Sequence, residues 1–170
     1  VIMFKKIFLL LFLISFVSVN SCIAETSDYM VEERKFVNYQ TNNTIEKMKI
    51  YRRAVYSTLE STPPQAIEIK KLDKEFYGQI KPILTEDFYT MNRLSRLTSK
   101  PKPSKGLVNV EKKKLKANSK VLDSYTTAYE NDLYKILTPT QKSKYMKLKK
   151  EKMKEIVKQV LREKKLLSVL

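Results

Sequence analysis

The chain has 170 residues, with 34 Lys or Arg against 18 Asp or Glu, which gives a formal charge of +16. This charge predicts anionic or acidic partners, or a need for solubility, but does not indicate a fold. A turn-rich β fold is disfavoured, because there are only two Gly and no Trp. The absence of His removes the usual general base and the commonest zinc or copper ligand, so we predict no enzyme, no metal site and no cofactor.

The first residues have the features of an export signal. Lys5 and Lys6 precede a run at residues 7–19 that is too short to span a bilayer but has the length of a signal-peptide core. Two cleavage sites compete. One releases residues 1–24 as a signal peptide, and the other ends a lipoprotein signal before Cys22, which would then be lipidated. We expect a periplasmic protein in both cases, anchored to the membrane through Cys22 in the second.

Residues 25–42 are polar and lack a clear period, so we expect a flexible tail there. We predict that residues 43–168 form a single helical domain. Its first helix is expected over residues 44–60 with Asn43 as N-cap, because apolar side chains recur at spacings of three and four. This apolar stripe consists of Ile45, Met48, Tyr51, Val55 and Leu59.

A short turn at residues 61–65 predicts the start of a second helix. Thr62 is a favourable N-cap, and Pro63 falls at the first helical position, where no N–H is needed. Gln65 falls where its side chain can reach back to the backbone N–H of Thr62 and close a capping box. The apolar stripe of this helix consists of Ile69, Leu72, Phe76 and Ile80.

Two features predict that this second helix is interrupted. Pro82 lacks an N–H and clashes with the preceding turn, so we expect a break or kink near residues 79–81. Thr85, which two acidic residues follow, has the character of a third helix start.

The expected loop of the domain lies at residues 98–109, which include two Pro and one Gly. Asn109 is the expected N-cap of a long helix over residues 110–137. Its apolar side chains fall on one helical face and comprise Leu115, Leu122, Tyr125, Tyr129, Leu133 and Ile136.

The pattern of the first turn recurs after this helix. Leu137 precedes Thr138, a second N-cap, with Pro139 at the first helical position and Gln141 placed to close a capping box. One helix therefore ends and the next begins with almost no linker. The final helix is amphipathic and strongly basic, with 11 Lys or Arg against three Glu in residues 139–170.

These elements predict an all-α protein built as an elongated hairpin of long helices. Helices of about 40 Å are hard to wrap around one compact core in a chain of this length. We therefore expect a second copy to complete the apolar stripe as an antiparallel homodimer, with a monomeric bundle as the alternative.

The exported, all-helical pattern with two related turns resembles the Spy/CpxP family of periplasmic stress proteins, whose motif is Leu-Thr-x-x-Gln. The turn at residues 137–141 fits this motif completely, whereas the turn at residues 61–65 has Ser in place of Leu. The resemblance covers residues 44 to about 160. It implies a cradle-shaped antiparallel dimer that acts as an ATP-independent chaperone or as a modulator of envelope stress. The partners it implies are unfolded or misfolded envelope proteins, or a sensor domain.

The residues support part of this hypothesis on their own. Lys-rich helices with a broad apolar, Tyr-rich face can hold unfolded proteins, because charge speeds capture and apolar surface adapts to many partners. The alternative is a structural or adhesive (lipo)protein whose basic final helix lies on an anionic membrane surface.

Two further patterns are interpreted structurally. Tyr residues beside many Lys are compatible with nucleic-acid binding, but behind an export signal we expect them to pack between helices, and we predict no nucleic-acid partner. Glu32-Glu33 and Glu86-Asp87 are adjacent pairs whose members point to different helix faces, so we interpret them as capping or solvated charge.

Overall fold

The computed structural model describes residues 27–151, and this part of the chain is all-α, as predicted. Three helices have defined bounds: α2 spans Ser27–Thr58, α3 spans Pro63–Thr98 and α4 spans Lys105–Ile136. A final helix begins at residue 139 and continues to the end of the described part at residue 151. The expected signal segment and Cys22 lie outside the described residues.

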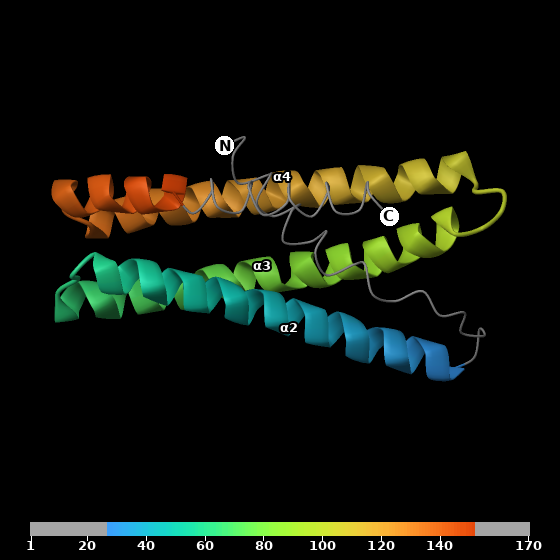
Figure 1. The fold of residues 1–170 in the computed structure, drawn as a ribbon, viewed down its shortest axis with the longest axis horizontal. Coiled ribbons are helices and arrows are strands. Elements are labelled where there is room, and N and C mark those ends of the chain that lie inside the picture. Colours follow the sequence, from blue (N-terminus) through green and yellow to red (C-terminus); the bar gives the residue numbers. More distant parts are fainter. Residues whose placement is uncertain (1–26, 152–170) are drawn as a thin grey trace, which may run out of the picture.

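The helices form an elongated assembly in which α3 is central (Figure 1). α3 has 36 residues and is therefore about 54 Å long. It runs antiparallel to α2 and α4 and packs on both. The chain reverses at residues 59–62 and again at residues 137–138, and both reversals lie at the same end of the molecule, on the left in Figure 1. The connection at residues 99–104 lies at the opposite end.

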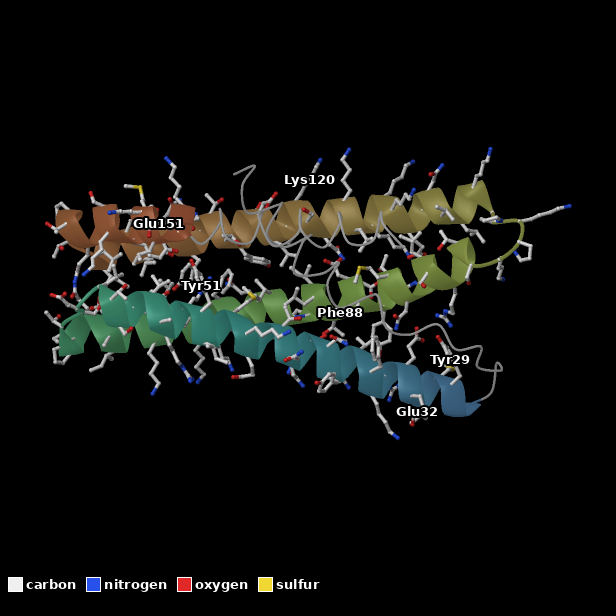
Figure 2. The ribbon with its side chains drawn as sticks, viewed as in Figure 1. Tyr29, Glu32, Tyr51, Phe88, Lys120 and Glu151 are labelled. Atoms are coloured by element: carbon white, nitrogen blue, oxygen red, sulfur yellow. The ribbon has the colours of Figure 1, made fainter. Side chains whose placement is uncertain are left out.

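The core consists of the apolar stripes of the three long helices. Figure 2 shows Phe88 inside the assembly, where it is 2% exposed, whereas Lys120 lies on the outer side of α4. Tyr51 departs from its predicted stripe, since it is 36% exposed. The buried apolar residues are Val37, Ile45, Val55, Leu59, Ile69, Phe76, Tyr77, Ile80, Leu84, Phe88, Leu122, Tyr129, Leu133 and Leu137.

The first helix is longer than its sequence pattern predicts. Residues 27–42 continue α2 instead of forming a flexible tail, and Asn43 lies inside the helix rather than at its N-cap. Packing against α3 compensates for the weak period of this segment: Val37 is fully buried, and the Thr41 and Thr85 hydroxyl oxygens lie 3.3 Å apart. Long-range contacts therefore override a weak local signal.

The second helix does not break at Pro82, contrary to one of the two predicted outcomes, a break or a kink. Pro82 lies inside α3, which continues through residues 79–81. The proline removes the hydrogen bond to the carbonyl of Gly78, but that residue is exposed, so water can serve this carbonyl. Thr85 is also interior, and its hydroxyl donates to the Lys81 carbonyl at 2.9 Å instead of capping a new helix. Burial of the helix on both sides of the proline keeps it continuous.

The loop before α4 is shorter than predicted. α3 ends at Thr98 and α4 begins at Lys105, so only residues 99–104 connect them. Ser104 is the N-cap, and its carbonyl accepts the first helical bond from Val108 at 3.0 Å. The predicted cap, Asn109, therefore lies in the second turn of the helix. Ser is as favourable an N-cap as Asn, so sequence preference alone does not separate the two positions.

Candidate functional site

The second turn has the geometry of a capping box. The backbone N–H of Thr138 donates to Gln141 Oε1 at 3.0 Å, and the backbone N–H of Gln141 donates to Thr138 Oγ1 at 3.3 Å. α4 ends at Ile136, and Leu137, the C-cap, is 4% exposed. Pro139 takes the first position of the final helix. The turn thus buries an apolar side chain while satisfying the free N–H groups of a helix start.

The first turn repeats this arrangement. Thr62 has extended backbone angles, and Pro63 begins α3. The backbone N–H of Thr62 donates to Gln65 Oε1 at 3.0 Å. Glu60, just before the turn, has a positive φ of 54°, which reverses the chain direction between the helices. Ser61 occupies the position that Leu137 has in the second turn.

The two turns bind each other through their glutamines. Gln65 Nε2 donates to the Ile136 carbonyl at 2.8 Å and to Gln141 Oε1 at 3.0 Å. In return, Gln141 Nε2 donates to the Leu59 carbonyl at 3.1 Å and lies 3.3 Å from Gln65 Oε1. Each glutamine therefore caps the start of its own helix and the end of the helix that precedes the other turn. Sequence reasoning placed both residues in local capping roles and did not anticipate this contact.

A buried polar network lies next to the paired turns and joins three helices. Arg52 of α2 forms a 2.8 Å ion pair with Asp73 of α3, and the Tyr129 hydroxyl of α4 donates to the same carboxylate at 2.7 Å. The Tyr56 hydroxyl is hydrogen-bonded to the Tyr129 hydroxyl. Burial raises the pKa of Tyr56 to about 12, although the nearby Arg52 cation opposes the shift, so this hydroxyl stays protonated at neutral pH.

Aromatic rings enclose the cation of this network. The Arg52 guanidinium lies 3.8 Å from the ring centroid of Tyr129 and 4.1 Å from that of Phe76. Such contacts stabilise a desolvated cation. A sequence signal for this cluster exists: Arg52 lies four residues after Met48, and Asp73 lies four residues after Ile69, so both charges continue an apolar stripe.

A groove of about 1060 Å³ runs between the second half of α2 and the first half of α3. It lies at the same end of the molecule as the paired turns. Its acidic residues are already engaged, since Glu60 pairs with Lys144 at 3.3 Å and Asp73 pairs with Arg52. The apolar lining is formed by Tyr56, Ala66, Ile67, Ile69 and Tyr77, and the basic lining by Lys49, Arg53, Lys70, Lys71 and Lys74.

The basic lining is largely unneutralised. Lys49 pairs with Glu46 at 2.6 Å. Within residues 27–151, the other four cations of the groove (Arg53, Lys70, Lys71 and Lys74) form no ion pair. The groove therefore combines an apolar floor with cations on both rims.

Two residues that line the groove, Ser61 and Tyr77, have a side-chain oxygen that is shielded from solvent. Within the described part of the chain, neither Ser61 Oγ nor the phenolic oxygen of Tyr77 has a partner at hydrogen-bond distance and angle. Burial raises the pKa of Tyr77, so its hydroxyl remains a neutral donor. Buried polar groups are rarely left unpaired, and each such exception calls for a physical explanation.

The acidic pairs do not all behave as solvated charge. Asp87 is 5% exposed and accepts a 2.8 Å hydrogen bond from the side-chain amide of Asn118. Burial raises the pKa of Asp87 to about 6, with the nearby Glu86 adding to the shift and the Asn118 bond opposing it. Glu33 pairs with Arg96 at 3.0 Å. The interpretation as exposed or capping charge is therefore wrong for Asp87, which a helix–helix contact buries.

Residues 27–151 hold no group of three or more Cys, His, Asp or Glu arranged to bind a metal ion. Over the same range, no helix has the length and apolar character needed to cross a membrane. A scan against protein-family models, a search of curated proteins and a search of solved structures each found no match to this chain.

Proposed function

We propose that this chain is an exported, ATP-independent chaperone or envelope-stress modulator that binds unfolded or partner proteins. One observation carries the proposal: the open groove between α2 and α3 has an apolar floor and four cations that form no ion pair within residues 27–151. Apolar surface can bury varied side chains, and a field of one sign speeds encounter with acidic segments. The likeness of its two turns to the Spy/CpxP motif supports the same function.

The proposed homodimer has a candidate interface on α2. Ile50 is 63% exposed, and with Tyr51 and Val55 it lines a second, smaller groove that extends to Leu148 of the final helix. Exposed apolar groups on a long helix favour contact with another chain. The mass of the exported protein in solution, measured by light scattering, tests this arrangement, and a monomer at micromolar concentration would refute it.

The chaperone activity is testable with a chemically denatured client diluted into buffer without ATP. We expect an equimolar amount of the dimer to reduce light scattering from the aggregating client. Lys70→Glu with Lys74→Glu should weaken this effect, because the change reverses charge on one rim of the groove. The matched control is Lys112→Glu with Lys113→Glu, at exposed positions on α4. Unchanged aggregation in the presence of the wild-type protein would refute the chaperone function.

The membrane-surface function is the second candidate, and the basic final helix favours it. Lys142, Lys147 and Lys150 form no ion pair within the described part, whereas Lys144 pairs with Glu60. Flotation with vesicles that contain anionic lipid tests this candidate, and an absence of binding at low salt would eliminate it. The mass of the mature N-terminus shows whether Cys22 carries a lipid.

A further inference from the structure

We propose that the groove between α2 and α3 binds a short, extended polypeptide segment in which acidic and apolar side chains alternate. The inference rests on the proposed function and narrows it, since it names both the site and the class of sequence that occupies it.

The spacing of the cations suits such a segment. Lys70 and Lys74 lie on the α3 rim, and Arg53 lies on the α2 rim next to Lys49, which pairs with Glu46. Residues four apart on a helix are separated by about 6 Å along its axis. Alternate residues of an extended chain are separated by about 6.6 Å. Acidic side chains at every second position can therefore meet successive cations, while the side chains between them face the apolar floor.

The length of the groove indicates a segment of about five residues. Its α3 wall runs from Ala66 to Tyr77, which corresponds to about 17 Å of helix. An extended chain covers this distance in about five residues.

The distribution of the cations distinguishes a peptide from a single-headed amphiphile. Arg53, Lys70 and Lys74 line the groove at separate positions along its two walls. A peptide can carry acidic side chains along its whole length, whereas an amphiphile with one head group presents charge at one end only.

Charge argues against occupancy by this chain itself. Residues 152–170 contain six Lys or Arg and two Glu, so the basic rims would repel them. A second copy carries the same excess of positive charge. The complementary occupant is a different, acidic polypeptide.

Comparison of the two turns identifies the residue that keeps the groove open. Leu137 fills its space in the second turn and is 4% exposed. Ser61, which lines the groove, has a shorter side chain at the equivalent position of the first turn. Ser61→Leu should therefore fill this end of the groove and supply the side chain that the second turn already accommodates.

The test measures fluorescence anisotropy of a labelled heptapeptide that alternates Glu and Leu, titrated with the full-length exported protein. We expect saturable binding that weakens at least tenfold when Gln replaces Glu in the peptide. Lys70→Glu with Lys74→Glu should weaken binding at least tenfold, and Ser61→Leu at least fivefold. The control, Lys112→Glu with Lys113→Glu, should stay within twofold of wild type. Circular dichroism confirms that each variant is folded.

Several results would overturn the inference. Equal binding of the Glu and Gln peptides would remove the charge argument, and wild-type affinity in the charge-reversal variant would place the site elsewhere. Binding of decanoate but not of the peptide would assign the groove to an amphiphile. The two proposals fail separately. Suppressed client aggregation without peptide binding refutes only the peptide site in the groove, whereas peptide binding without suppressed aggregation refutes only the chaperone function.

Discussion

The paired glutamines allow a quantitative test of how the two turns support each other. Gln141→Ala removes the acceptor for the Thr138 N–H, the donor to the Leu59 carbonyl and the contact with Gln65. At about 1 kcal/mol for each hydrogen bond, the free energy of unfolding should fall by about 2–3 kcal/mol. Gln65→Ala removes an equivalent set and should cost about the same.

A double-mutant cycle separates the local caps from the contact between the turns. Both single variants lose the Gln65–Gln141 bonds. The loss of unfolding free energy in the double variant should therefore be about 1 kcal/mol smaller than the sum of the losses in the two single variants. Urea denaturation followed by circular dichroism gives the free energy of unfolding of the wild type and the three variants. The dependence of this free energy on urea concentration should be the same for all four proteins. Gln79→Ala, an exposed position on α3, is the matched control and should change stability by less than about 0.5 kcal/mol. Strict additivity would show that the turns are independent caps and would refute the reasoning.

Three further predictions concern stability. Thr138→Ala should cost about 1 kcal/mol through the lost cap and should affect client binding only by changing the angle between helices, so full stability with lost binding would contradict this role. Gly78→Ala should stabilise α3 by about 1 kcal/mol and so raise the melting temperature, because the residue is exposed and the new Cβ meets no atom within 4 Å. A loss of stability would show that the segment before Pro82 needs the flexibility of glycine. Asp87 has a pKa of about 6 in the folded state against about 3.8 unfolded, so the folded state binds its proton more tightly. The stabilising contribution of this protonation to the free energy of unfolding is complete below about pH 4 and is lost as pH rises through 6. Asp87→Asn should therefore stabilise the protein at pH 7 by up to about 3 kcal/mol and should flatten the pH dependence of the free energy of unfolding measured in urea. An unchanged pH dependence would contradict a buried carboxyl at this position.

Two cross-links between helices lie beside the groove. The paired glutamines join the two turns, and the Arg52–Asp73 ion pair joins the two helices that form the groove walls. A rigid wall lowers the entropic cost of binding, because its side chains are already ordered before a partner arrives. The long Lys side chains on the rims can pack their stems along a partner while their charged ends stay in water.

The sequence by itself determined the fold class and the capping residues of the two turns. Apolar spacings of three and four predict the stripes of α3, α4 and the second half of α2, and Thr, Pro and Gln at fixed positions predict the two helix starts near residues 62 and 138. These signals are local, because each depends on residues within one or two helical turns. The weaker local signals at Asn43, Pro82 and Thr85 failed because packing against neighbouring helices outweighed them.

Only the tertiary structure decided which residues form the candidate site. Gln65 and Gln141 are 76 positions apart, and the ion pair of Arg52 with Asp73 spans 21 positions. No periodicity encodes such pairings, because they depend on how α2, α3 and α4 pack side by side. The same packing buries the hydroxyl oxygens of Ser61 and Tyr77 and makes α2 and α3 the walls of a groove.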